Sequence, residues 1–161
     1  MTLSFILNGE PVTVNVEPNR RLIDILRNDF ELTGCKSGCL GGLCGACAVI
    51  FNGIVSPACL IPAFRIRDST IITIEGFARS NHYKDIERGF SLHDVESCGY
   101  CGASKFLITE ILLVEKKTPS REEILKAFDS VKCRCTLGEN LIDAVMAASE
   151  IRQRRLREQN A

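Results

Sequence analysis

Long hydrophobic runs and an excess of either charge are both missing from this sequence. The longest strongly apolar stretch, residues 106–114, is too short and too interrupted to cross a bilayer. Lysine plus arginine and aspartate plus glutamate number 20 each, whereas binding to nucleic acid usually demands a basic face. We therefore expect neither a membrane nor a nucleic-acid partner.

A secretory leader is also missing from the first residues. Residues 1–10 contain no basic segment followed by a long apolar one. We therefore expect a cytoplasmic protein, a setting in which disulfides are rare. At 161 residues, with 45% hydrophobic and 25% charged residues, the chain has the composition of an ordinary soluble protein with one medium domain or two small ones.

Cysteine, by contrast, is abundant, with nine residues in the chain. Four of them follow a spacing typical of a plant-type [2Fe–2S] ligand set, Cys39-x4-Cys44-x2-Cys47-x11-Cys59. Structural zinc usually takes two tight pairs separated by a longer loop, which this spacing fits poorly. A disulfide scaffold and reduced core cysteines also compete with the cluster, and the missing leader argues against the scaffold. We interpret the four cysteines as ligands of an electron-transfer cluster.

Glycines surround these cysteines. Gly34, Gly38, Gly41, Gly42 and Gly45 can take positive φ and have no Cβ, so backbone N–H groups can approach the cluster sulfurs. Two ferric irons, two sulfides and four thiolates carry a charge of about −2, and N–H donors stabilise the addition of an electron to such an anion. Gly38, Gly42 and Gly45 are therefore predicted to contribute to cofactor binding.

A second group of cysteines lies in the other half of the chain, as Cys98-Gly-Tyr-Cys101 and Cys133-Arg-Cys135. Zinc and a redox-active dithiol stay open on this spacing alone. Each pair precedes a predicted helix, so the positive ends of two helix dipoles would face the ligands and favour an anionic cluster. A Rieske centre needs two histidine ligands, and neither of the two histidines has the required cysteine spacing.

The first half has the pattern of a small mixed sheet. Apolar residues with a period of two flank Asn8-Gly9, which predicts a β-hairpin, and the same pattern around Asn52-Gly53 predicts a second one. A helix is expected over residues 21–30, before the cysteine loop, and a last strand over 70–74. This order suits a β-grasp ferredoxin-like domain.

The hydrophobic period changes from two to about 3.6 after residue 76, which predicts helices. One is expected over residues 103–117, and a shorter one over 85–94. Ser120 with Glu123 and Thr136 with Glu139 form two capping-box patterns, each predicted to begin a further helix.

These patterns predict an α+β protein. The expected domains are a plant-type ferredoxin-like domain over residues 1–76, a linker over 77–81 and a four-helix domain over 82–161.

The two halves together resemble the iron–sulfur subunit of molybdenum hydroxylases. That family includes xanthine dehydrogenases, aldehyde oxidoreductases, molybdenum-type carbon monoxide dehydrogenases and 4-hydroxybenzoyl-CoA reductases. The motifs that carry the resemblance are Gly34 to Cys39, Cys44-Gly-Ala-Cys47, Ala58-Cys59-Leu60, Thr73-Ile-Glu-Gly76, Cys98-Gly-Tyr-Cys101 and Cys133-Arg-Cys-Thr136. They extend over nearly the whole chain and fill all eight ligand positions.

The resemblance implies a heteromeric oxidoreductase complex in which this chain has no substrate site of its own. A large subunit would hold the molybdopterin cofactor and hydroxylate the substrate, and a medium subunit would hold FAD. Cys98, Cys101, Cys133 and Cys135 would hold the [2Fe–2S] cluster nearer molybdenum. The cluster nearer FAD would be held by Cys39, Cys44, Cys47 and Cys59 and would pass the electrons to the flavin.

The sequence departs from the family pattern in three places. Ser97 stands where the family usually has a glutamine that contacts the pterin, Gly102-Ala103-Ser104 replaces Thr-Pro-Gly, and Leu137-Gly138 replaces Gly-Tyr. We expect these changes to lie on the face that meets the molybdenum subunit. They predict a divergent partner or an altered pterin contact at Ser97, with both clusters retained.

Several residues have more than one interpretation. Cys35 is expected to be a small semi-exposed or buried residue, and the competing hypothesis is that it can substitute for the ligand Cys39. Arg134 either raises the potential of the nearby cluster, meets the large subunit, or is simply solvated. The arginines near the C-terminus are expected to complement a helix dipole and stay solvated, with a docking role as the alternative, and these are Arg152, Arg154, Arg155 and Arg157.

Two other functions compete with the subunit interpretation. A free-standing two-cluster ferredoxin or redox sensor would be a monomer with a charged docking face, and the neutral overall charge argues mildly against it. A zinc-binding structural module is the third possibility, and the loop glycines argue against it.

Overall fold

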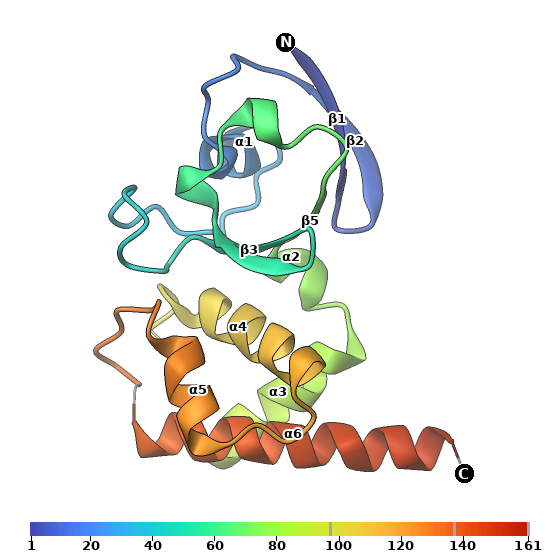
Figure 1. The fold of residues 1–161 in the computed structure, drawn as a ribbon, viewed down its shortest axis with the longest axis vertical. Helices are drawn as coiled ribbons and strands as arrows, with labels where there is room; N and C mark the ends of the chain where they lie inside the picture. The colour runs from blue at the N-terminus through green and yellow to red at the C-terminus, as the bar shows by residue number, and fades with distance from the viewer. Residues whose placement is uncertain (97, 137, 161) are drawn as a thin grey trace.

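The computed structural model describes residues 1–96, 98–136 and 138–160, and it consists of a sheet domain and a helical domain (Figure 1). The sheet is five-stranded, with the order β2-β1-β5-β3-β4. Strands β1 and β5 are parallel, and the other neighbouring pairs are antiparallel. The predicted α+β class is confirmed.

The first hairpin consists of β1 (Thr2–Leu7) and β2 (Glu10–Asn15). Asn8 and Gly9 between them take φ values of 53° and 90°, as a two-residue hairpin turn of matching twist requires. Alternate residues of β1 are buried, which explains the period of two in the sequence.

Helix α1 (Leu22–Asn28) covers the sheet with four consecutive or near-consecutive apolar residues that are fully buried: Leu22, Ile23, Ile25 and Leu26. A second hairpin follows the cysteine loop, with β3 (Ala48–Phe51) and β4 (Ile54–Pro57). Two short 3₁₀ helices, η1 (Ala58–Leu60) and η2 (Ala63–Arg65), then lead to β5.

Strand β5 (Thr70–Ile72) is shorter than the strand predicted over residues 70–74. It ends at Ile72 because the short helix α2 (Ile74–Phe77) begins two residues later. The Asn8 side chain accepts a hydrogen bond from the Thr73 backbone N–H at 2.8 Å. That N–H is therefore taken by a side chain, and the Thr73 carbonyl accepts the Phe77 N–H as the first helical bond.

The helical domain contains α3 (Asn81–Leu92), α4 (Gly102–Glu115), α5 (Arg121–Phe128) and α6 (Glu139–Gln159), as the four-helix prediction required. Their shared core includes the fully buried Ile86, Leu107 and Val145. The capping box of Ser120 and Glu123 is confirmed at the start of α5, with both reciprocal hydrogen bonds present. Across the described ranges, no helix combines the length and apolar character needed to span a membrane.

The prediction of the second capping box was wrong. Helix α6 begins at Glu139 with Gly138 as its N-cap residue, and no side chain caps it. The Thr136 hydroxyl instead accepts a hydrogen bond from the Lys105 ammonium. The hydroxyl oxygen that was predicted to cap α6 therefore accepts a hydrogen bond from a buried lysine instead.

The two domains pack through an apolar seam beneath β3 and β4. Ile50 of β3 is 4% exposed and belongs to the core of the helical domain, with Val55 and Ile72 packed against the same core. Helix α4 lies under this side of the sheet (Figure 1). The sheet thus has α1 on one face and α4 on the other, and the cysteine loop projects from its edge.

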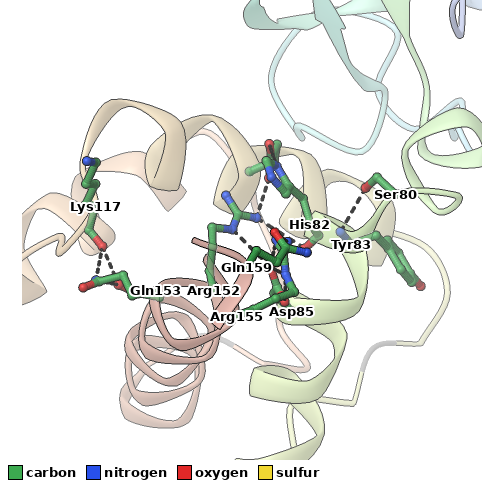
Figure 2. A network of polar contacts seen from close by, with 11 residues as sticks. Ser80, His82, Tyr83, Asp85, Lys117, Arg152, Gln153, Arg155 and Gln159 are labelled. Atoms are coloured by element: carbon green, nitrogen blue, oxygen red, sulfur yellow. Dashed lines mark hydrogen bonds and ion pairs between the residues drawn. The ribbon is translucent and has the colours of Figure 1, made fainter. Parts of the chain in front are cut away.

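A buried polar network joins α3, α4 and α6 (Figure 2). Arg152 is 6% exposed, and its Nη2 donates to Glu110 Oε2 at 2.6 Å and to the His82 carbonyl at 3.3 Å. Arg155 pairs with the buried Asp85 at 2.7 Å. The expectation that Arg152 is solvated was therefore wrong, because the buried carboxylates of Asp85 and Glu110 give its guanidinium partners inside the domain.

Because α3 packs closely on α6, we expect a side chain added at Gly89 of α3 to destabilise the fold. A Cβ at Gly89 would lie 2.6 Å from the Ala144 carbonyl oxygen and 2.6 Å from the Ala148 nitrogen, and both are backbone atoms. Gly89→Ala should therefore lower the free energy of unfolding by about 1–3 kcal/mol despite the better helix propensity of alanine. Chemical denaturation measures this change.

The control for this substitution is Ser91→Ala, two residues later on the exposed side of α3. It should change the free energy of unfolding by less than about 0.5 kcal/mol. Equal stability of the two variants would contradict the close helix contact.

Candidate iron–sulfur sites

The first four cysteines meet around the loop between α1 and β3. Cys39, Cys44 and Cys47 belong to this loop, and Cys59 belongs to η1. The Cys47 carbonyl accepts a hydrogen bond from the Ala58 N–H at 3.0 Å, which holds η1 beside the end of the loop. The η1 segment thus brings the distant fourth cysteine to the other three.

Backbone N–H groups converge on the sulfur of Cys39. Those of Gly41, Leu43 and Cys44 donate to this sulfur at 3.3, 3.2 and 3.4 Å. These donors, with Gly41 first, lower the pKa of Cys39 to about 6. The loop therefore stabilises a thiolate, which is the form of cysteine that binds a metal.

Each of the three predicted glycines lies where a side chain would disturb the loop. A Cβ on Gly38 would be 2.7 Å from Cys44 Sγ, and one on Gly42 would be 2.5 Å from Leu60 Cδ1. A Cβ on Gly45 would be 2.3 Å from the Ser130 carbonyl oxygen. Gly42 and Gly45 also take positive φ, at 76° and 73°. A side chain at any of the three positions would therefore clash, but their contribution to cofactor binding stays a prediction.

The second set of cysteines lies at the start of α4 and between α5 and α6. Cys101 is the N-cap residue of α4, and Cys98 precedes it. Burial opposes ionisation of Cys133, but the backbone N–H groups of Thr136 and Cys135 and a hydrogen bond with Cys101 lower its pKa to about 6. Burial raises the pKa of its neighbour Cys101 to about 11. The backbone donors around Cys133 thus favour the thiolate form that binds a metal.

Each set is arranged as two pairs of cysteines. Four pairs of sulfurs lie close enough for one to shift the pKa of the other, namely Cys39 with Cys44, Cys47 with Cys59, Cys98 with Cys135, and Cys101 with Cys133. In residues 1–96, 98–136 and 138–160, no group of three or more His, Cys, Asp or Glu side chains is placed to hold one metal ion. Two thiolates on each of two irons is the ligand pattern of a [2Fe–2S] cluster, and the paired sulfurs fit it.

The two sets lie next to each other across the domain boundary. The Cys44 carbonyl accepts a hydrogen bond from the Lys132 N–H at 3.1 Å, and Lys132 directly precedes Cys133. The Ser104 hydroxyl donates to the Gly45 carbonyl at 2.6 Å. The Tyr100 hydroxyl, between Cys98 and Cys101 in the sequence, donates to the Ser37 carbonyl at 2.9 Å. Three hydrogen bonds therefore connect the first cysteine loop to the segments that carry or flank the second set of cysteines.

Ser104 corrects part of the sequence interpretation. We expected the departures at Gly102-Ala103-Ser104 to face the molybdenum subunit, but Ser104 is fully buried and faces the sheet domain. Its hydroxyl reaches the loop because α4 packs directly beneath it. Ser97 and Leu137 lie outside the described residues.

Cys35 lies beside the predicted ligand Cys47, on the buried side of the first cysteine loop. Its side chain is 2% exposed within the core of the sheet domain, and its Sγ donates to the Cys47 carbonyl at 3.4 Å. Burial raises the pKa of Cys35 to about 12. A neutral core thiol is the expectation that this placement favours, whereas Cys39, the ligand it was considered to replace, is exposed.

Sequence reasoning missed Lys105, which lies one turn after Cys101 on α4 and is fully buried. Its Nζ donates to the Thr136 carbonyl at 2.8 Å. The available signal was a lysine four residues after a predicted ligand, on the helix face that also carries the buried Ile108 and Leu112. That signal was hidden by the expectation that lysine is exposed.

Comparison with known proteins finds two family models that match successive parts of the chain. The model of the 2Fe-2S iron-sulfur cluster binding domain matches residues 5–66, and that of the [2Fe-2S] binding domain matches residues 73–146. The nicotinate dehydrogenase small FeS subunit of Eubacterium barkeri is 42% identical over 136 residues, which cover 84% of this chain and 87% of that protein. The nicotine 6-hydroxylase small subunit of Paenarthrobacter nicotinovorans is 34% identical over 142 residues, covering 88% and 86%.

A solved structure has the same fold. A chain of quinoline 2-oxidoreductase from Pseudomonas putida 86 superposes with a TM-score of 0.87 at 34% sequence identity, and the match covers 96% of both chains. The match therefore includes both domains and their relative placement.

The contact at Gly45 predicts that the first cysteine loop depends on the second domain. Gly45→Ala should push the loop away from the backbone of Ser130 and Val131, and we expect it to lower the iron content of the purified chain by about half, which is one of two clusters. Iron analysis and low-temperature EPR of the reduced protein measure this loss.

Gly53→Ala is the matched control, because Gly53 also takes positive φ, at 83°, but has no atom within 4 Å of a built Cβ. It should keep its full iron content. An equal loss in both variants would attribute the effect to backbone strain and contradict the role of the contact.

Proposed function

The chain belongs to the small iron–sulfur subunits of molybdenum hydroxylases, which carry two [2Fe–2S] clusters, and from that premise we propose that it relays electrons from the molybdenum subunit to an FAD subunit. It is an electron-transfer subunit of a heteromeric oxidoreductase complex. The hydroxylation itself belongs to the large subunit. The finer proposal concerns which residues hold each cluster and where the electrons leave.

We assign one cluster to the first four cysteines and the other to the second four. The first set is Cys39, Cys44, Cys47 and Cys59, and the second is Cys98, Cys101, Cys133 and Cys135. Their arrangement in pairs supports the assignment, as do the N–H groups directed at Cys39. Each cluster supplies a site that accepts and releases one electron at a time.

The observation that carries the relay is the hydrogen bond between Cys44 and Lys132. A proposed ligand of one cluster accepts, through its own carbonyl, the N–H of the residue that precedes a proposed ligand of the other. This bond and a short stretch of backbone form a continuous route from Cys44 to Cys133. The close packing at Gly45 leaves no room for a side chain beside this route and holds its length fixed.

Each cysteine set also reaches the surface at its outer end, which supports an entry and an exit for electrons. Cys98 and Cys135 are exposed in the second set, and Cys39 is exposed in the first. Exposed apolar side chains lie on the loop that carries Cys39 or next to its Gly42, and we call them the loop patch: Leu40, Leu43 and Leu60. Leu43 is 74% exposed, as is typical of a surface that a partner covers. We propose that the FAD subunit covers the loop patch and that the molybdenum subunit meets Cys98 and Cys135.

The proposed domains are residues 1–76 for the FAD-side cluster and 82–161 for the molybdenum-side cluster. The two family matches, 5–66 and 73–146, divide the chain in the same region and support this boundary. Residues 77–81 then connect the end of α2 to α3.

The composition of the intact complex tests the proposal. A tagged chain isolated anaerobically from its native host should carry about four irons per chain and co-purify with stoichiometric molybdenum and FAD. A complex with molybdenum but no flavin would contradict the FAD step. A monomeric chain with full iron content and no partners would point instead to a free-standing two-cluster ferredoxin or redox sensor.

The loop patch gives a sharper test. Leu43→Glu places a charge in the centre of the proposed FAD interface, so the isolated complex should lose at least nine-tenths of its FAD, on the order of 1.4 kcal/mol or more of docking free energy. Molybdenum, iron and both EPR signals should be retained.

Leu92→Glu is the matched control, since Leu92 is 64% exposed on α3 and lies outside the loop patch. That variant should keep its FAD. Retention of FAD by Leu43→Glu would place the flavin subunit elsewhere on the chain.

A further inference from the structure

Lys105 is a buried positive charge that the relay described above does not use. Its side chain is fully buried, at 0% exposure, and among the described residues it is the largest side chain buried to that degree. Its Nζ donates to the carbonyl and to the hydroxyl of Thr136, which are both neutral oxygens. None of the ion pairs between described residues includes Lys105.

An ammonium ion buried without a counter-ion is strongly unfavourable, because transfer out of water removes its hydration. The other buried cation of the helical domain follows that rule, since Arg152 has Glu110 at 2.6 Å and Asp85 at 3.6 Å. Lys105 needs a comparable negative partner. Its two hydrogen bonds among the described residues go to Thr136, and the ionisable groups on which its charge acts are sulfurs of the second cysteine set.

The charge of Lys105 acts on three of the four cysteines in the second set. Its positive charge favours the thiolate forms of Cys101, Cys133 and Cys135. Its Nζ also donates to the carbonyl of Thr136, the residue directly after Cys135, at 2.8 Å. Lys105 lies one helical turn after Cys101, and its backbone N–H bonds to the Cys101 carbonyl at 3.3 Å. Helix α4 therefore fixes the ammonium on the same side as the cluster ligands.

We propose that Lys105 is the counter-charge of the molybdenum-side cluster and raises its reduction potential relative to an otherwise identical site without this charge. The proposal rests on the ligand assignment made above. An oxidised [2Fe–2S] cluster with four thiolates carries about −2, and its reduced form carries about −3. A fixed positive charge stabilises the more negative form more strongly, and the buried surroundings leave the attraction largely unscreened.

Arg134 provides the matched comparison. It lies between Cys133 and Cys135 in the sequence and is therefore close to the same cluster, but its side chain is exposed to solvent. Water and salt screen an exposed charge. Burial, rather than proximity along the chain, thus makes Lys105 the cation with the larger effect on the potential.

Redox titration followed by EPR tests the proposal on the purified complex, with Lys105→Met and Lys105→Gln as uncharged variants. Each should make reduction of the molybdenum-side cluster at least tenfold less favourable, a shift of about −59 mV for a one-electron couple. The FAD-side cluster, titrated in the same sample, should keep its potential. Arg134→Met should shift the molybdenum-side potential by less than half as much.

An unchanged molybdenum-side potential in both uncharged variants would overturn the proposal, and so would an equal shift in Arg134→Met. If both uncharged variants lack this cluster, Lys105→Arg decides: the cluster should be present, because the charge is retained, and its absence would overturn the proposal. Loss of the second EPR signal in the unsubstituted chain would instead contradict the ligand assignment, so the two failures are distinguishable.

Discussion

The close backbone contact between the first cysteine loop and the segment that precedes Cys133 is the constraint on which the rest of the structure depends. At Gly45 the two backbones approach so closely that no side chain fits, and beside it the Cys44 carbonyl bonds to the Lys132 N–H. The apolar seam formed by Ile50 and α4 holds the sheet domain on the helical domain at that distance. Two domains that each have a core of their own are thereby fixed as one unit, as a relay between them requires.

The sequence predicted the elements with local signals better than the contacts between distant segments. Asn8-Gly9 and Asn52-Gly53 were predicted correctly as hairpin turns because only residues tolerant of positive φ fit there. The capping box at Ser120 was also found, whereas the similar pattern at Thr136 failed because a lysine 31 residues away occupies the threonine oxygen. Local patterns carry no information about such a competitor, which explains why the two motifs had different outcomes.

In the candidate sites, too, features with a local sequence pattern were predicted and features that depend on distant contacts were not. Cysteine spacing predicted the first ligand set, since that spacing is itself a chemical requirement of a plant-type cluster, whereas the second set was predicted from the family resemblance. Both ligand assignments stay predictions. The buried charges were not predicted from the sequence, because lysine and arginine are normally exposed and that expectation outweighed the apolar helix face on which Lys105 lies. Arg152 and Lys105 are both buried, but the first pairs with two carboxylates, whereas the second belongs to none of the ion pairs between described residues and donates to the two oxygens of Thr136. Arg152 is therefore part of a structural ion-pair network, whereas Lys105 is a buried charge next to the second set of cysteines.

The central claim is that one chain holds two clusters close enough to exchange electrons directly. Low-temperature EPR of the fully reduced protein tests it most directly, because two paramagnetic clusters in contact through Cys44 and Lys132 should split or broaden each other's signals. The account predicts two distinguishable rhombic signals, with magnetic interaction that disappears when only one cluster is reduced. A single signal, or two signals of unchanged shape at every stage of reduction, would contradict it.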